Sequence, residues 1–320
     1  MRTKFGLILL VVLAMVAAGC GDDDAGDTTT ATTAAATTTT AADTTTTTAA
    51  ATTTTEADAC AIDQLNLVTP GTLTVATGEP AFPPWVNSIT GGGFDDPESK
   101  EGFEAALAYE IASELGFADD AVEWVRTTFD EAITPGEKSF DFNLQQYSIT
   151  AAREEVVDFS DPYYEVKQAL VTVVGSAADG ATTIEELKGL RLGAAIATTS
   201  LDLIESVIDP DTEASVYNDN TDVQSALIAG QIDAFVVDFP TAFFITAVTL
   251  TVDEVGQEGV IVGQFESPGD EPEEFGLLFA DGNPLVPCVN EALATLRADG
   301  TLAALEQQWL VSGADVAVFG

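Results

Sequence analysis

Short apolar runs alternate with helical repeats along the chain from about residue 65 onward. The runs at 71–77, 122–127, 140–148, 191–197 and 232–238 are rich in β-branched or aromatic residues and are bounded by turn residues, which predicts strands. Stretches with apolar residues three or four positions apart lie between them, which predicts helices. Because strands alternate with helices, the pattern predicts an α/β fold with parallel sheets that helices cover on both faces.

The clearest helix signal lies at 101–117, where apolar residues recur at every fourth position from Leu107. Thr183 and Glu186 have the spacing of a capping box, which predicts a further helix start in the middle of the chain. Other helices are predicted at 199–208, 221–230, 239–248, 284–300 and 301–310, the last two separated at Asp299 and Gly300.

The first nineteen residues have the layout of a secretory signal peptide. Arg2 and Lys4 precede an apolar stretch at 5–16, and small residues follow it. The alternative, a transmembrane anchor, needs a run of about 20 apolar residues, and this run is shorter. The sequence Ala-Ala-Gly-Cys resembles a bacterial lipobox, which implies that Cys20 carries a lipid and becomes the mature N-terminus; Ala17 stands where Leu is usual.

Residues 20–59 form a segment made almost entirely of Thr, Ala and Asp. Without larger apolar side chains it cannot bury enough surface to offset its ordering entropy, so it is predicted to be a disordered linker. A flexible chain of this length reaches about 35 Å on average.

Composition excludes some functions and bears on the cysteines. The chain has 53 acidic and 10 basic residues, a net charge of −43, which argues against nucleic acid as a partner. It has no histidine and no Cys-x-x-Cys, so neither a metal site nor a cofactor is expected. In an exported protein with Cys20 acylated, Cys60 and Cys288 are predicted to form a disulfide; two buried free thiols are the alternative.

Side chains of complementary chemistry follow the ends of the predicted strands. In parallel sheets these ends share one edge, where ligands bind. One guanidinium, several hydroxyls, a carboxylate and aromatic rings together suit a zwitterion such as an α-amino acid, because a carboxylate favours Arg and N–H donors and an ammonium favours a carboxylate. The candidates are Glu79, Phe82, Trp85, Ser148, Arg153, Thr198 and Thr199 within the stretch 197–200, and Asp238.

The stretch SITAAREEVVDFSDPYY at 148–164 resembles the signature of family 3 extracellular solute-binding proteins. Supporting stretches follow in the family's order and spacing: GTLTVAT with PPW, then ATTS at 197–200, IDAFVVD, and ADGT before a Trp. The resemblance extends from about residue 71 to residue 310. It implies a type II periplasmic-binding-protein fold, with two α/β lobes and the ligand cleft between them.

The resemblance also implies a role for most of these candidates, and it adds Phe129 to them. Aromatic platforms correspond to Phe82 and Phe129. The groups that bind the ligand carboxylate correspond to Ser148, Arg153, Thr198 and Thr199, the acid that binds the ammonium to Asp238, and the residue that contacts the ligand side chain to Glu79.

Two features depart from the family pattern. Gln145 and Gln146 replace small residues, and Ala197 replaces a glycine. Residues alternate between the two faces of a strand, so one glutamine is expected to face the cleft, and we assign this place to Gln146. The side-chain amide of either glutamine would narrow the pocket or form a hydrogen bond with a polar ligand side chain.

Each candidate also has a purely structural interpretation. Arg153 could pair with neighbouring glutamates, Asp238 could only cap a helix, as could Thr198 and Thr199, and the two phenylalanines could belong to the core. Trp85 fits the pocket rim and the core equally well.

The predicted organisation is a signal peptide at 1–19, the linker at 20–59, lobe 1 at 60–165 plus 263–320, and lobe 2 at 166–262. The resemblance implies the monomeric substrate-binding lipoprotein of an amino acid ABC importer, exported and lipid-anchored on the outer face of the cell membrane. A free amino acid would close the hinged lobes, and a permease would recognise the closed form. The alternatives are an enzyme on the same scaffold, similar to cyclohexadienyl dehydratase, and a ligand-sensing lipoprotein.

Overall fold

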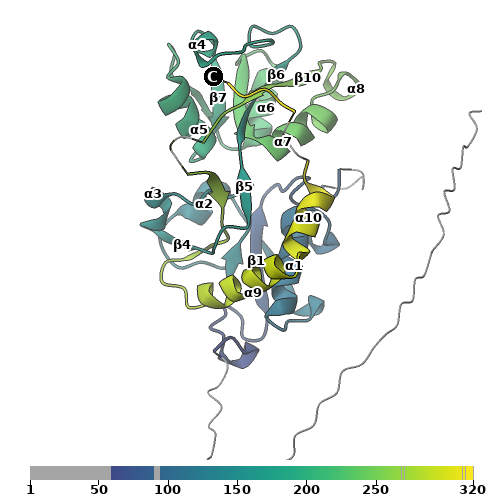
Figure 1. Cartoon of the computed structure of the whole chain (residues 1–320), viewed down its shortest axis with the longest axis vertical. Helices are drawn as coiled ribbons and strands as arrows, with labels where there is room; N and C mark the ends of the chain where they lie inside the picture. The colour runs from purple at the N-terminus through teal and green to yellow at the C-terminus, as the bar shows by residue number, and fades with distance from the viewer. Residues whose placement is uncertain are drawn as a thin grey trace, which may run out of the picture. The chain divides into compact units, whose positions relative to one another are not determined.

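Two five-stranded sheets with flanking helices make up the described part of the chain (Figure 1). The computed structural model describes residues 59–89, 94–267, 269, 271–311, 313 and 315–319. The predicted signal peptide, Cys20 and nearly all of the predicted linker lie outside the described residues. No helix among the described residues is long and apolar enough to cross a membrane.

The first sheet has the strand order β2-β1-β3-β12-β4 and the second has the order β10-β6-β9-β7-β8. We call each sheet with its helices a lobe: α1, α2, α3, α9 and α10 belong to the first lobe, and α4 to α8 to the second. The strands are β1 (Leu73–Gly78), β2 (Val122–Thr127), β3 (Phe142–Asn143), β4 (Val157–Phe159), β5 (Tyr164–Val166), β6 (Gln168–Val173), β7 (Leu192–Ala195), β8 (Ser215–Tyr217), β9 (Ala234–Asp238), β10 (Gly259–Gln264), β11 (Glu273–Phe275) and β12 (Leu278–Ala280).

The predicted helices lie close to their predicted positions, whereas the short helices at 129–133 and 252–255 were not predicted. The capping box is present, with Thr183 at the N-cap of α4 and Glu186 bonding back to it. The helices predicted at 199–208 and 239–248 each begin as α-helix and end in a π-helical turn. The helices are α1 (Phe103–Glu114), α2 (Phe129–Ile133), α3 (Ala151–Glu154), α4 (Ile184–Leu187), α5 (Thr199–Leu203), α6 (Asn220–Ile228), α7 (Phe239–Phe244), α8 (Val252–Val255), α9 (Val286–Ala298) and α10 (Thr301–Trp309).

The sheets are mixed, whereas the alternating pattern predicted parallel sheets. The centre of each sheet is parallel, because β1 pairs with β2 and β3, and β7 pairs with β8 and β9. Strands β12, β6 and β10 run antiparallel to their neighbours. Along the chain, β6 directly follows the crossing strand β5, β10 precedes the crossing strand β11, and β12 directly follows it.

Two crossing strands, β5 and β11, pair antiparallel with each other, with Phe275 opposite Tyr164 and Glu273 opposite Val166. A third segment returns to the second lobe after α10 (Figure 1). Val318 pairs with Gln264, and the ring of Phe319 packs on Phe265 with centroids 4.8 Å apart. The prediction that 263–320 belongs wholly to lobe 1 is therefore wrong for this end of the chain. The apolar Phe319 completes the second core, and no periodic pattern in the sequence indicates this.

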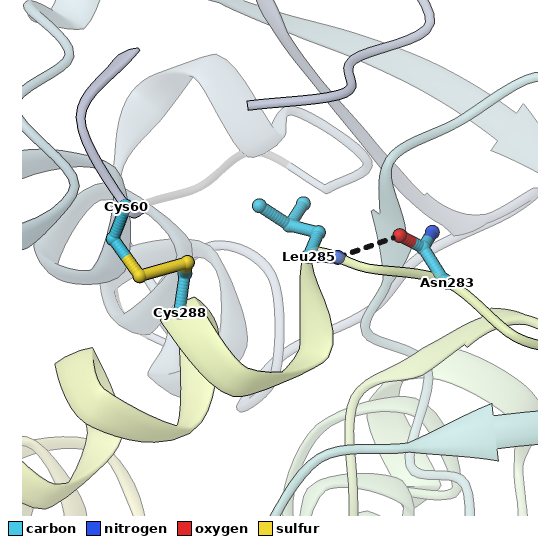
Figure 2. Close-up of a disulfide and its surroundings, with 4 residues drawn as sticks. All are labelled: Cys60, Asn283, Leu285 and Cys288. Atoms are coloured by element: carbon cyan, nitrogen blue, oxygen red, sulfur yellow. Dashed lines mark hydrogen bonds between the residues drawn. A yellow bond between two sulfur atoms is a disulfide. The ribbon is translucent and has the colours of Figure 1, made fainter. Parts of the chain in front are cut away.

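The chain's entry into the first lobe is attached to its C-terminal helices. Cys60 and Cys288 form a disulfide, with Cα atoms 5.4 Å apart (Figure 2). Cys288 lies in the first turn of α9, just after Leu285, whose backbone N–H donates to the side chain of Asn283 at 2.9 Å. Cys60 and Cys288 join a core formed by β1, α1, α9 and α10, on the side of the first sheet where these helices pack.

Candidate functional site

A cavity of about 700 Å³ opens between the two lobes. Residues of both sheets line it, at the ends of β1, β7 and β9 where the alternation of strands and helices predicts a ligand site. Nine of the ten residues predicted for the site line this cavity: Glu79, Phe82, Trp85, Phe129, Gln146, Ser148, Thr198, Thr199 and Asp238. The tenth, Arg153, lies directly behind them.

Arg153 belongs to the first lobe and forms hydrogen bonds with both lobes, next to the cavity. Its side chain lies in α3, is 8% exposed, and donates to the backbone carbonyls of Ser148 at 2.6 Å and Ala197 at 2.9 Å. Its guanidinium carbon is 5.4 Å from the ring centroid of Phe129. Burial lowers the pKa of Arg153, and the charge of Glu273 acts in the opposite direction. No ion pair with a neighbouring glutamate forms among the described residues, so the surface interpretation of Arg153 is wrong.

Ala197, which receives this bond, has a left-handed backbone with φ at 61°. A residue with a Cβ rarely adopts this conformation, which explains why a glycine is favoured at the position. The interlobe bond from Arg153 holds Ala197 in place at some cost in strain.

Ser148 and Thr199 meet across the cavity with their hydroxyl oxygens 3.2 Å apart. Both hydroxyls also donate to one carboxylate oxygen of Glu273, each at 2.6 Å. Gln168 donates to the same carboxylate at 3.1 and 3.2 Å, and it accepts from Ser200 at 2.6 Å. Neither Glu273 nor Gln168 was predicted from the sequence, because Glu273 is 125 residues from Ser148 and no motif connects them.

Asp238 ends β9 and begins α7, and it is 8% exposed. Its carboxylate accepts from the backbone N–H of Thr241 at 3.1 Å, so it caps the helix and also lines the cavity. The pKa of Asp238 is raised to about 6: burial is the largest cause, the charge of Glu273 acts in the same direction, and the bonds from Thr241 oppose both. A buried carboxylate with few donors stabilises a cation that enters the cavity.

The two glutamines differ from the prediction that only Gln146 faces the cleft. Both Gln145 and Gln146 line the cavity. The predicted strand at 140–148 ends early, since β3 covers only Phe142–Asn143 and Gln146 has a left-handed backbone with φ at 53°. Strand alternation therefore does not apply at these positions.

A buried carboxylate explains the conformation of Gln146. Glu104, on α1, is 1% exposed and accepts from the backbone N–H of Gln146 at 2.8 Å. It also accepts from the Gln146 side-chain amide and from the hydroxyl of Tyr163. The pKa of Glu104 is raised to about 7, because the effect of burial exceeds the opposite effect of these hydrogen bonds.

The aromatic candidates join the cavity to the cores. Trp85 is 2% exposed and packs in the first core, yet its indole N–H donates across the cavity to Thr241 at 2.8 Å. Phe82 packs on Phe244 of the second lobe, with ring centroids 6.3 Å apart. The rings of Trp85 and Phe82 therefore pack in a hydrophobic core and line the cavity at the same time.

The cavity wall is acidic. Glu79, Asp130 and Asp219 line it with Asp238, and no lysine or arginine does so among the described residues. No group of His, Cys, Asp and Glu in the described part of the chain has the arrangement of a metal site. These acidic side chains favour a positively charged ligand, because no basic side chain in the described part of the wall neutralises them.

Comparison with known proteins identifies the fold. Residues 74–312 match the model of the bacterial extracellular solute-binding proteins, family 3. The L-cystine-binding protein TcyJ of Escherichia coli K12 is 29% identical over 77% of this chain and 84% of its own length. The histidine-binding periplasmic protein of the same strain is 27% identical, over 75% and 88%.

Solved structures give the same result. An ancestral arginine-binding protein bound to arginine is 30% identical, with a TM-score of 0.60, over 75% of this chain and 98% of that one. The ancestral amino acid-binding protein AncCDT-1, a precursor of cyclohexadienyl dehydratase, is 27% identical, with a TM-score of 0.58, over 75% and 96%. The fold is the two-lobed type II periplasmic-binding-protein fold, and the chain belongs to the bacterial extracellular solute-binding proteins of family 3.

Proposed function

We propose that this protein is the extracytoplasmic substrate-binding component of an amino acid ABC importer, and that it binds one free amino acid between its lobes. One observation carries the proposal: Ser148 of the first lobe and Thr199 of the second lie 3.2 Å apart in a cavity lined by predicted ligand residues. The names of the relatives, which bind cystine, histidine and arginine, support an amino acid as the ligand class.

The ligand's two charged groups are proposed to bind at opposite poles, a carboxylate on the cavity wall and a guanidinium directly behind it. The α-carboxylate is placed towards Arg153, whose fork has donors beyond the two that bond carbonyls. The α-ammonium is placed at Asp238, whose buried carboxylate lacks a cationic partner among the described residues. Ser148 and Thr199 are proposed to bind the same carboxylate, as the family resemblance implies.

The acidic wall supports an amino acid with a positively charged side chain. Glu79 and Asp130 line the cavity on the first lobe and Asp219 on the second. A cationic side chain would be attracted by all three, and a carboxylate side chain would be repelled. Phe82 and Phe129 would cover its apolar part.

Binding is proposed to proceed by hinged closure. Ligand groups that contact both walls stabilise the closed arrangement, because the open one offers only half of the contacts. The hinge between the lobes is proposed to lie at the crossing strands β5 and β11. The closed form would be the one that a permease recognises.

The N-terminal region is proposed to hold the protein at the membrane. The predicted signal peptide directs export, the lipid on Cys20 anchors the chain, and the linker at 20–59 separates the lobes from the membrane. Radiolabelled palmitate should enter the wild-type chain in cells and be absent from a C20A variant. A C20A variant that stays labelled and membrane-bound would contradict the anchor.

Calorimetric titration of the purified full chain with the common amino acids and L-cystine tests the proposed ligand class. L-arginine, L-lysine or L-histidine should bind, and L-glutamate should not. A D238N variant should bind at least about ten-fold more weakly, the effect of one charge-assisted contact. D253N, an exposed aspartate on α8 remote from the cavity, should bind as the wild type does. If none of these amino acids binds, the proposed function is wrong.

The expectation that the protein is not an enzyme belongs to the same proposal. The similarity to AncCDT-1 makes a dehydratase the sharpest enzymatic alternative, and Glu79 is a carboxylate in the cavity that could serve as its acid or base. Incubation with prephenate or arogenate should give no product above the uncatalysed rate; turnover that E79Q abolishes would establish the alternative.

A further inference from the structure

The chain passes from the first lobe to the second after α10, at the peptide bond between Leu310 and Val311 (Figure 1). Leu310 packs against the core of the first lobe, and Val311, the next residue, packs against a core of the second lobe. Consecutive Cα atoms are only about 3.8 Å apart. Leu310 already has an extended backbone, with φ at −103° and ψ at 150°. The chain therefore has little slack where it crosses.

Beyond this crossing the chain is attached to the second lobe, and we call the described residues of this segment the strap: 311, 313 and 315–319. The backbone N–H of Gln264 donates to Ala317, and the N–H of Phe319 donates back to Gln264, each at 2.8 Å. The side-chain amide of Gln264 donates to the carbonyl of Gly313 at 2.6 Å. Phe319 is buried against Phe265. Because these partners belong to the second lobe, the strap moves with that lobe.

A second cavity, of about 770 Å³, lies on the other side of the crossing strand β5 from the ligand cavity. Tyr164 and Lys167 line this rear cavity, whereas Gln168, the next residue along the chain, lines the ligand cavity. Leu310 and Val311 also line the rear cavity. The crossing at Leu310 and Val311 is therefore separated from the ligand by the proposed hinge.

A rotation about the crossing strands moves the lobes in opposite directions on the two sides of the hinge. Closing the ligand cavity widens the rear cavity, and opening the ligand cavity narrows the rear one. Leu310 and Val311 are adjacent and are held by different cores, so the rear side can widen little before the chain between the cores is straight. The crossing therefore opposes closure, and opening only makes it slacker.

We propose that the strap is a rear restraint on the hinge, which limits how far the lobes close and lowers the closed population of the ligand-free protein. A ligand that contacts both walls of the ligand cavity must then supply the free energy of closure. This inference rests on the proposed function, because it requires hinged closure of the lobes.

Insertion of Gly-Gly between Leu310 and Val311 tests the inference, because it lengthens the crossing and keeps every contact of the strap. The matched control is a Gly-Gly insertion between Asp281 and Gly282, an exposed turn of the first lobe that lines neither cavity. F319A releases the strap in a second way, since it removes the apolar anchor on the second lobe. Thermal unfolding establishes that each variant folds.

The distance between the lobes measures closure without a ligand. Spin labels on p-acetylphenylalanine, placed at Glu131 of α2 and at Glu205 directly after α5, leave the cysteines unchanged. Both positions are exposed, and both helices have residues that line the ligand cavity. In pulsed electron paramagnetic resonance, the insertion at the crossing should raise the short-distance population of the ligand-free protein at least about two-fold over the wild type and the control.

Calorimetry with L-arginine gives a second measurement of the same effect. Its Kd should fall by the factor by which the closed population rises, because the affinity of a ligand scales with the fraction of protein in the binding-competent form. General damage to the fold would instead weaken binding and lower the melting temperature. F319A should change the distances in the same direction as the insertion.

A distance distribution that the insertion leaves unchanged, or shifts to longer distances, would overturn the inference. That result leaves the proposed function standing, because binding of amino acids to the wild type does not depend on the variants. A wild type that binds an amino acid without any change in the distance between the lobes would instead contradict the proposed hinged closure, and the inference with it.

Discussion

The indole N–H of Trp85 donates to the hydroxyl of Thr241 across the ligand cavity, at 2.8 Å. The two residues are 156 positions apart and belong to different lobes, so under the proposed hinged closure this bond forms only when the lobes close. Trp85 is 2% exposed, and loss of its partner leaves a buried donor unsatisfied.

A T241V variant should therefore shift the protein towards the open form and weaken amino acid binding by roughly 10-fold, or about 1.4 kcal/mol. Calorimetry measures the affinity, and small-angle scattering with and without ligand measures the closure. T246V is the control, because the Thr246 hydroxyl bonds only the backbone of its own helix. Identical affinities for the two variants would show that the cross-cavity bond adds nothing.

Arg153 should be essential to binding and moderately important to stability. R153A removes the positive charge nearest the proposed carboxylate site, and it leaves the carbonyls of Ser148 and Ala197 without their donor. We expect affinity for every amino acid to fall at least roughly 100-fold and the free energy of unfolding to fall by about 1–3 kcal/mol. R153K should fall between R153A and the wild type, because an ammonium lacks the planar fork.

The control for Arg153 is R297A, since Arg297 is exposed and bonds the carbonyl of Pro162 far from the cavity. Calorimetry and urea denaturation measure the two effects separately. An R153A protein that folds and retains wild-type affinity would remove Arg153 from the site.

Glu104 should make the folded protein less stable as the pH rises towards 7. Its pKa is about 7 in the folded chain against an ordinary value of 4.5, so the folded state holds the proton more tightly than the unfolded state. This contribution to stability is complete below pH 4.5 and is lost as the pH rises through 7, an effect of up to roughly 3 kcal/mol. Asp238, with a pKa of about 6, acts in the same direction from pH 3.8 to 6.

Urea denaturation of the wild type and E104Q between pH 5 and pH 8 measures this effect. The free energy of unfolding of E104Q should vary less over that range than that of the wild type, because the amide does not titrate. E114Q, an exposed glutamate on the same helix, corrects for the general acidity of the chain. Parallel pH profiles for wild type and E104Q would show that Glu104 titrates normally.

The Cys60–Cys288 disulfide should stabilise the protein without affecting the ligand site. It spans 228 residues, and neither cysteine lines the cavity. A C60S/C288S double variant should lose about 2–5 kcal/mol of unfolding free energy and keep its ligand affinity. Mass spectrometry of unreduced peptides measures the pairing directly, and separate Cys60 and Cys288 peptides would contradict it.

Local sequence patterns predicted the order of most elements and several residues that line the cavity. Periodicity and cap signals depend on a few adjacent residues, so the capping box at Thr183 and the strand that ends at Asp238 could be predicted from the chain alone. The family motifs then placed nine of the ten predicted residues on a cavity that both lobes line.

Only the tertiary structure decided the contacts between distant residues. The left-handed turn at Gln146 depends on Glu104, 42 residues earlier, and the direction of the Ser148 hydroxyl depends on Glu273, 125 residues later. The return of Phe319 to the second core likewise has no periodic signal. A buried polar group bonds whichever partner the folded chain places beside it, because water is absent there. The partner therefore depends on the packing of the whole chain and not on a local pattern.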